Sequence, residues 1–556
     1  MFCVGTLSLI VCFLGGEVDN VIAGNFINEN ALAAVGIVAS VYNVIVFFSV
    51  IVGDGGAIYY SRFIGKFQKD NAYKSFCTSI FGTIIMGVVL CILITVFEDP
   101  ILNFFGVSPG LLEYTHEYYS CFKFVGLVYP LYWLLYETVY NDGDEKIAAL
   151  SDVIQLVFNL ILSFVLCQSY GLAGVSMATF ICIVLSTLSL LIHFFKKSNS
   201  VKIKLAFNIK YLLNSIRYSV VEASTYLYSA LITTILNKYF IMSFGDFYLP
   251  ILNVALFGYA LGDVGQGIGN AITPFVCIYN SEKNNSGIKT IMKFAIKASI
   301  VTGIILSLVT FLCADLITSF LGVVTPELVE KSIFVLRCFS ITAFLLPIGY
   351  CFSQYYLITG RFAYGIVFIA IIYFIAPYFC IVLGYEIAGL DGTLIGFGVY
   401  PLAATLVIAL FLLIKHGKKF PFLLKDRNNH VKNINVLLNK DSISSVQEQS
   451  RIFLNEYSCS TQVINRVELL IEEIAILVIR KNRNKVIAEF TIIIEDDKVK
   501  IIERDNGVLF DITNVNQQCD DLNVYLLSNF MEYLAGRVYL KSTGFNRCSF
   551  LIDKID

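Results

Sequence analysis

Apolar runs of about twenty residues recur along the first three quarters of the chain, and they constrain its fold more than any other feature. A helical run of this length crosses about 30 Å of hydrocarbon. Of the 556 residues, 57% are hydrophobic and only 15% are charged, whereas about a quarter are charged in soluble domains. The chain is therefore predicted to be an integral membrane protein.

The distribution of charge divides the chain in two. Residues 415–556 hold 39 of the 82 charged residues in roughly a quarter of the length, which predicts a soluble domain after the membrane part. Within 1–414 the sequence predicts about twelve transmembrane helices. Their approximate spans are 2–22, 32–60, 76–97, 118–140, 147–166, 171–195, 216–243, 251–279, 294–314, 332–358, 364–383 and 390–414.

Basic residues in the predicted loops set the orientation. One set of alternate connections carries about seventeen Lys and Arg residues and the other about two, a strong positive-inside signal. Both termini are therefore predicted to be cytoplasmic. The first residues lack a basic n-region and an A-x-A-type cleavage site, so they are predicted to be the first transmembrane helix and not a signal peptide.

The other compositional features point to no metal, cofactor or nucleic acid. The fifteen cysteines contain no C-x-x-C pair, and most lie in apolar segments as small hydrophobic residues. The four histidines are scattered without metal-ligand spacing. The net charge of −2 predicts no nucleic-acid partner.

Carboxylates inside apolar segments are the candidate functional residues, because a charge at the bilayer centre costs about 2.5–3.5 kcal/mol or more. Asp19 and Glu17 lie in "LGGEVDNVIAG", and Asp54 and Asp263 lie in two Gly-Asp segments. Residues 53–76 and 262–290 both start Gly-Asp and end in a lysine-containing polar loop, which indicates a repeat of two halves. Asp54 and Asp263 are either a cavity-lining pair or structural residues, and Glu222 and Glu137 are weaker candidates.

Three segments resemble the MATE (multidrug and toxic compound extrusion) family of transporters. "VDNVIAGNFINENALAAVG" is similar to the exit of the family's first helix. "VYNDGDEKIAALSDVIQLVFNLILSFVLCQSYGLAGVSMAT" is similar to its fifth and sixth helices, and "GQGIGNAITPFVCIYN" to its eighth. The resemblance implies two six-helix lobes around a central cavity that opens alternately to either side, with 1–205 as the first lobe and 206–414 as the second.

The resemblance also implies a role for Asp19 in a cation site of the first lobe. The family's polar partners map onto Asn159, Ser163 and Thr179, and Asn159 and Ser163 are four residues apart on one helix face. Family members often have a second Asp where this chain has Ser163. A single carboxylate holds Na⁺ less strongly, since hard cations prefer several oxygen ligands, but it can carry a proton. H⁺ is therefore the favoured coupling ion and Na⁺ stays open, with Asp54, Asp263 and Glu17 as cavity candidates.

The C-terminal part resembles the histidine-kinase-like ATPase domain in its anti-sigma-factor form. A linker is predicted over 415–455 and a cytoplasmic α/β sandwich over 456–556, with a helix over 462–482, two strands, a second helix and a closing hairpin. Glu473, Asp505 and Gly507 match nucleotide-site positions. Leu477 and Leu509 replace a metal-binding Asn and a glycine, and Leu cannot ligate Mg²⁺. A degenerate domain without ATP hydrolysis is predicted, retained for regulation or for binding a cytoplasmic protein.

Together these features predict a multi-pass plasma-membrane antiporter that is not an enzyme. It would export organic, cationic or amphipathic small molecules against H⁺ or Na⁺, with a regulatory cytoplasmic domain. Two alternatives remain. One is a flippase for lipid-linked precursors, which basic residues around the cavity would favour. The other is a membrane signalling protein whose C-terminal domain binds a partner.

The orientation can be tested with reporter fusions. A cytoplasm-dependent reporter fused at residue 420 should be active, and a reporter that works only outside the cytoplasm should be inactive there, because the basic loops are retained inside. The opposite pattern would overturn the predicted topology.

Overall fold

The computed structural model describes residues 15–65, 68–107, 109–196, 199, 201–202, 204–263, 266–282, 284–417, 430–482, 485–495, 497–514, 534–542 and 545–554. The chain forms two compact units. The first comprises Met1–Ser61, Asp70–Val276 and Ile291–Leu423, and the second comprises Arg62–Lys69, Cys277–Thr290 and Leu424–Asp556. The second unit therefore combines two short segments from the helical part of the chain with the whole C-terminal domain.

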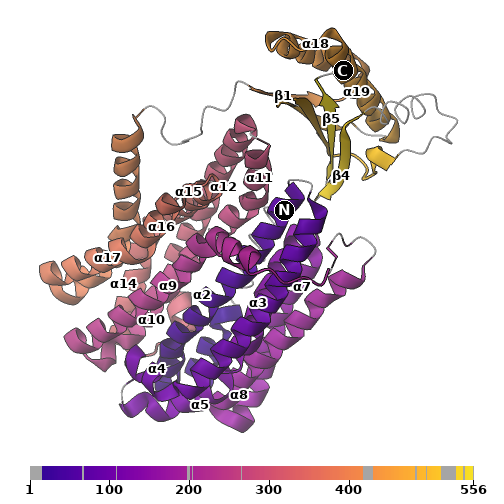
Figure 1. The fold of residues 1–556 in the computed structure, drawn as a ribbon. Helices are drawn as coiled ribbons and strands as arrows, with labels where there is room; N and C mark the ends of the chain where they lie inside the picture. Colours follow the sequence, from indigo (N-terminus) through magenta and orange to yellow (C-terminus); the bar gives the residue numbers. More distant parts are fainter. Residues whose placement is uncertain are drawn as a thin grey trace. The chain divides into compact units, whose positions relative to one another are not determined.

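The first unit is built almost entirely of helices (Figure 1). Its first half contains a helix over 15–26, α2 (Glu29–Gly65), α3 (Lys69–Val96), α4 (Glu98–Phe105), η1 (Pro109–Leu111), α5 (Leu112–Phe122), α6 (Val125–Asn141), α7 (Glu145–Val153), η2 (Ile154–Phe158), α8 (Asn159–Leu191) and η3 (Ile192–Phe195). Its second half contains α9 (Ile209–Phe244), η4 (Asp246–Tyr248), α10 (Leu249–Asp263), α11 (Gln266–Ser281), α12 (Asn285–Leu312), α13 (Ala314–Phe320), α14 (Pro326–Ser340), η5 (Ala343–Leu345), α15 (Leu346–Ile358), α16 (Phe362–Ala370), η6 (Ile371–Ile375) and α17 (Ala376–His416). The ends of α2 and α11 extend into the second unit.

Several of these helices can cross a membrane. Among the described residues, six are long and apolar enough, or seven if the bent pair Pro326–Ser340 and Ala343–Ile358 forms one span. The two longest stretches, of 51 and 55 residues, exceed the roughly 20 residues that one crossing needs. Each is broken at a glycine, Gly171 or Gly389. The expected count of about twelve spans stays a prediction.

The two halves repeat the same backbone features. Gly171 (φ 55°, ψ −137°) and Gly389 (φ 58°, ψ −131°) break their helices in the same conformation, which only glycine adopts readily. The left-handed Gly106 and Gly143 likewise correspond to Gly322 and Gly360. The π-helices η2 and η6 occupy matching positions as well. All these pairs are separated by 216–218 residues, so the repeat is a property of the fold.

This separation differs from the repeat that the sequence suggested. Pairing Asp54 with Asp263 implies a spacing of 209 residues, about eight residues out of register with the other pairs. The Gly-Asp-Gly-Gly segment of α2 has a packing role of its own. A Cβ on Gly53 would lie 2.9 Å from the backbone of α6, and one on Gly55 would lie 2.7 Å from the Ser215 carbonyl of α9. These glycines let α2 approach both neighbouring helices closely.

The second unit contains a five-stranded antiparallel sheet. Its strands are β1 (Val431–Leu437), β2 (Ile487–Ile494), β3 (Lys498–Asp505), β4 (Gly536–Ser542) and β5 (Phe545–Asp553), in the order β1-β2-β3-β5-β4. The helices α18 (Lys440–Glu456) and α19 (Thr461–Lys481) cover one face of the sheet (Figure 1). The apolar stripes of these helices pack on alternate residues of the strands and form a buried core. This core includes Leu470 and Ile474 of α19, Phe490 of β2 and Phe550 of β5.

The structure changes one boundary of the predicted C-terminal domain. Residues 431–455, predicted to belong to the linker 415–455, form β1 and all but the last residue of α18, because Ile434, Ile443 and Val446 are apolar enough to join the core. The predicted helix at 462–482, the two strands and the closing hairpin are present as α19, β2, β3, β4 and β5. The predicted second helix at 523–536 lies almost wholly outside the described residues. The relation to ATPase domains stays a prediction.

Candidate cation site and central cavity

The carboxylate of Asp19 lies buried among hydrogen-bond donors from two other helices. Thr179 donates its hydroxyl to Oδ1 at 2.9 Å and to Oδ2 at 2.7 Å. Tyr118 of α5 donates to Oδ2 at 2.6 Å, and Asn159 donates from Nδ2 to Oδ1 at 3.3 Å. Ser163 donates to Oδ1 of Asn159 at 2.9 Å. The structure thus brings together Asp19 and the three partners that the resemblance implied.

The local fold of α7 and α8 explains how residues twenty positions apart share this site. The π-helix η2 ends at Phe158, directly before Asn159, and π-turns inside helices often occur at functional sites. The break at Gly171 then folds the second half of α8 back on the first. A Cβ on Gly174 would lie 2.3 Å from the Leu166 carbonyl. This close return places the Thr179 hydroxyl 3.4 Å from Oδ1 of Asn159.

A small cavity opens beside the Asp19 carboxylate. Its volume is ≈ 90 Å³, and its lining includes Asp19, Tyr118, Gln155, Asn159 and Thr179. The oxygen atoms of Asp19, Asn159 and Thr179 could serve as ligands for one small cation, and the carboxylate could take up one proton. The side chains described as donating to Asp19 are all neutral, so ionisation of Asp19 leaves a negative charge that these donors do not neutralise.

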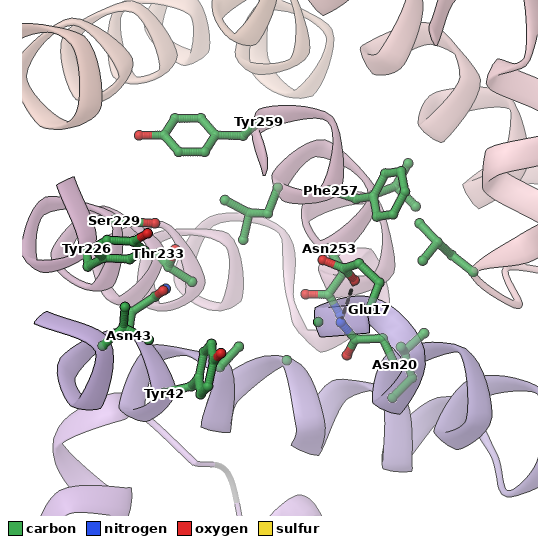
Figure 2. A pocket seen from close by; sticks show the side chains of 18 of the residues that line it. Glu17, Asn20, Tyr42, Asn43, Tyr226, Ser229, Thr233, Asn253, Phe257 and Tyr259 are labelled. Atoms are coloured by element: carbon green, nitrogen blue, oxygen red, sulfur yellow. Dashed lines mark hydrogen bonds between the residues drawn. The ribbon is translucent and has the colours of Figure 1, made fainter. Parts of the chain in front are cut away.

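A second, larger cavity of ≈ 310 Å³ lies between the two halves of the first unit (Figure 2). Glu17 faces it and accepts a hydrogen bond of 2.8 Å from Nδ2 of Asn20. Among the described lining residues, Glu17 is the only Asp, Glu, Lys or Arg. The other lining residues are Gly16, Leu32, Gly36, Ala39, Tyr42, Asn43, Val46, Tyr129, Trp133, Thr225, Tyr226, Ser229, Thr233, Pro250, Asn253, Val254, Leu256, Phe257, Tyr259, Leu321 and Val323.

Aromatic side chains form much of this lining. Trp133, the only tryptophan of the chain, lies edge-on to Tyr226 with 6.3 Å between ring centroids. Tyr42 and Tyr129 share a hydrogen bond of 2.7 Å between their hydroxyl groups. Figure 2 shows Tyr226 at the same cavity as Glu17. A wall of aromatic faces with one carboxylate suits a ligand that is both apolar and positively charged.

The remaining membrane candidates lie elsewhere. Asp54 is buried and is not among the lining residues of either cavity. It interacts electrostatically with Glu222 of α9 and Glu137 of α6. Asp263 ends α10, and its side chain lies outside the described part of the structure. The pairing of Asp54 and Asp263 at one cavity stays a prediction.

Two of the C-terminal candidates, Asp505 and Gly507, have hydrogen-bond partners within their own domain. Asp505 is buried and accepts hydrogen bonds from the Gly507 amide at 2.7 Å and from Asn546 Nδ2 at 3.2 Å. Glu473 lies on α19, and Leu477 is buried in the domain core. These neighbours give Asp505 and Gly507 a structural role in the loop after β3.

Sequence reasoning missed Tyr118 and the polar lining of the larger cavity. Nothing in the run of residues at 114–119 distinguishes Tyr118 from the tyrosines beside it, because only the packing of α5 against the first helix selects it. The asparagines Asn20, Asn43 and Asn253 carried a usable signal. Each lies in an apolar segment, where an amide needs a polar partner or a water-filled cavity.

Comparison with known proteins agrees with these features. Residues 6–165 match the family described as MatE. The multidrug export protein MepA of Staphylococcus saprophyticus is 23% identical over 344 residues, covering 60% of this chain and 75% of that protein. The protein of the same name from Staphylococcus aureus strain MRSA252 is 23% identical over 369 residues, covering 64% of this chain and 79% of that protein.

Solved structures show the same fold. A transporter of the MOP superfamily from Pyrococcus furiosus matches with a TM-score of 0.66 at 20% identity, covering 74% of this chain and 95% of that one. An outward-facing multidrug resistance MATE transporter gives a TM-score of 0.65 at 20% identity, with the same coverage. Residues 6–165 are thus similar in sequence to the MatE family, and the helical part of the chain has the fold of the solved MATE transporters, which is that of a multi-pass membrane protein.

The contribution of Tyr118 can be measured directly. Tyr118→Phe removes the 2.6 Å hydrogen bond to Asp19, and a bond to a charged group contributes about 1.5–3 kcal/mol. We expect solute flux in proteoliposomes to fall, because without this donor the ionised form of Asp19 is less stable. Tyr119→Phe, which loses only a 3.3 Å bond to the Ile94 carbonyl, is the matched control. Equal flux in both variants would show that the Tyr118 hydroxyl does not contribute to transport.

Proposed function

We propose that this chain exports organic, cationic or amphipathic solutes by alternating access, in exchange for H⁺, with Na⁺ as the alternative coupling ion. The observation that carries the proposal is the buried Asp19 carboxylate, which has neutral donors around it and lies on the same helix as Glu17 of the larger cavity. The MepA relatives are named as multidrug export proteins, which supports a solute of this kind.

The ligand set at Asp19 favours a proton. The site offers one carboxylate, and Ser163 stands where members of the resembled family often have a second. Since Na⁺ binds best to several charged or carbonyl oxygens, a single proton is the simpler way to neutralise Asp19.

The two cavities share a wall, which gives a physical route for coupling. Gly16, Asn20, Ala39 and Tyr42 line both of them. Glu17 and Asp19 are two residues apart on one helix, so they point to different sides of it. When a proton neutralises Asp19, the hydrogen bonds that it accepts weaken, because charge-assisted bonds are the stronger ones. A resulting shift of this helix would move Glu17 in the solute cavity.

The charge of the larger cavity supports a cationic solute over a lipid-linked precursor. Its described lining has one carboxylate and contains no Lys or Arg, whereas a diphosphate-linked lipid needs cationic partners. Aromatic rings such as Trp133 and Tyr226 can stack on an apolar cation. The flippase alternative is therefore the less favoured one.

Flux in proteoliposomes with imposed gradients tests the proposal. Asp19→Asn should retain solute binding and lose flux driven by a proton gradient, because an amide cannot take up and release the proton. Glu17→Gln should raise the KM for cationic solutes more than for neutral ones. Glu113→Gln, at an exposed carboxylate of α5, is the control and should transport normally.

Each other outcome of this experiment points to a different function. Wild-type flux in a well-folded Asp19→Asn protein would exclude the coupling role of Asp19. Flux that depends on a sodium gradient and not on a proton gradient would identify Na⁺ as the coupling ion in place of H⁺. Solute binding without any flux in the wild-type protein would favour the signalling alternative.

The C-terminal domain is proposed to be regulatory and without ATPase activity. Leu477 is packed in the core, and both Gly507 and Asn546 already donate to Asp505. We expect the purified full-length chain with Mg²⁺ and ATP to release no phosphate above background. Phosphate release that Glu473→Ala abolishes would contradict this prediction.

A further inference from the structure

One face of the C-terminal sheet carries a row of charged side chains. Glu489 of β2, Arg504 of β3 and Arg547 of β5 lie directly opposite one another in the strand register. The helices α18 and α19 cover the opposite face (Figure 1). Two arginines in adjacent register positions repel each other, and like charges placed this way destabilise a sheet. Within the row, Glu489 accepts a hydrogen bond of 2.7 Å from Nη1 of Arg504. A second anion close to both guanidinium groups would balance the charge of Arg547 as well.

Glu282 supplies this anion, and it comes from a distant part of the sequence. It belongs to Cys277–Thr290, the segment that spans the junction of α11 and α12 and forms part of the second unit. Arg547 donates from Nε to Oε1 at 2.8 Å, and Arg504 donates from Nη2 to both carboxylate oxygens at 2.9 Å. Glu282 and Arg547 are each 2% exposed, so water does not compete for these bonds.

Neighbouring residues of the same segment extend the contact across the sheet. Asn284 donates to Oε1 of Glu489 at 2.8 Å and accepts from Asn433 of β1 at 2.9 Å. Tyr279 donates to Oε2 of Glu489 at 3.2 Å, and its ring lies 4.8 Å from the Arg504 guanidinium. The segment thus contacts β1, β2, β3 and β5 through side chains that match it in charge and in hydrogen bonding.

The ionic contact persists over a wide pH range. Burial disfavours the charged form of Glu282, but Arg547 and Arg504 outweigh it and lower the pKa of the carboxyl below its usual 4.5. A lowered pKa in the docked state means that the contribution of the ion pair is present above pH 4.5 and is lost only as the pH falls further. The contact is therefore fully formed at neutral pH.

We propose that this face of the sheet is a docking surface whose ligand is the chain's own segment 277–290, with Glu282 as the anchor. Because the segment connects α11 and α12, any movement of these helix ends pulls on the docked residues. The C-terminal domain can then follow or restrain the helical part of the chain without hydrolysing nucleotide. A partner that needs the Arg504–Arg547 face must first displace Glu282.

The proposal can be tested on the full-length chain by cutting the covalent link. A protease site inserted between residues 420 and 425 leaves the C-terminal domain held only by non-covalent contacts. The N-terminal part is immobilised in detergent, the protein is cleaved, and the rate at which the domain leaves the resin is measured. We expect slow release from the wild-type protein and release at least about tenfold faster from Glu282→Gln and Arg547→Gln, since losing one partner of a buried ion pair costs more than 1.4 kcal/mol.

Matched controls separate the anchor from general effects of substitution. Lys289→Gln, at an exposed residue of the same segment, and Glu495→Gln, at an exposed residue next to the end of β2, should release the domain as slowly as the wild type. Glu282→Gln combined with Arg547→Gln should be little faster than either single variant, because both changes break the same contact. Equal release rates for wild type and Glu282→Gln would overturn the proposal.

A competition experiment excludes misfolding as the cause of release. A synthetic peptide with the sequence of residues 277–290 is added in excess to the cleaved wild-type protein. It should accelerate release of the domain, whereas the same peptide with Glu282→Gln should not. Equal effects of the two peptides, or no effect of either, would show that Glu282 does not anchor the segment.

Discussion

The buried charge of Asp19 is the constraint on which the rest of the membrane part depends. Its carboxylate has neutral donors on Tyr118, Asn159 and Thr179, and none of these described partners is a cation. A permanently ionised group in this position would be expensive. The break at Gly171, the π-helix before Asn159 and the close return of α8 all assemble a site that tolerates the charge. An ion that binds and leaves is a way to balance it without a fixed cation.

The sequence predicts much of this site, for identifiable physical reasons. A carboxylate inside an apolar segment is costly in any membrane fold, so the positions of Asp19 and Glu17 in the sequence were enough to identify them as candidates. The resemblance to MATE transporters implied the partners Asn159, Ser163 and Thr179. Helical periodicity adds only that Asn159 and Ser163 lie on one helix face. Tyr118 could not be found in this way, because the packing of α5 against the first helix determines which tyrosine contacts Asp19. The same limit applies to the aromatic wall around the larger cavity.

The Gly-Asp segments show where pattern reasoning reaches its limit. Similar letters at 53–56 and 262–265 predicted matched carboxylates, yet the backbone repeat runs at 216–218 residues and puts them out of register. Gly53 and Gly55 serve close helix packing. Two helices that must approach closely need small residues whatever their function, so the glycines of the α2 segment reflect helix packing. In the C-terminal domain the linker prediction was wrong because most residues of α18 are polar. Its few apolar residues, among them Ile443 and Val446, were not recognised as the buried face of an amphipathic helix.

The two parts of the chain treat buried charge in opposite ways. The described donors to Asp19 are neutral, so none of them is a fixed positive charge beside the carboxylate. Glu282 accepts hydrogen bonds from two arginines, which keep it ionised. Its charge therefore holds segment 277–290 on the C-terminal sheet. A chain that needs both a mobile ion and a stable contact has to separate these environments, because an arginine beside Asp19 would hold it ionised. Glu282, Arg504 and Arg547 lie outside the apolar segments, so their ion pairs are compatible with the proton exchange that we propose at Asp19.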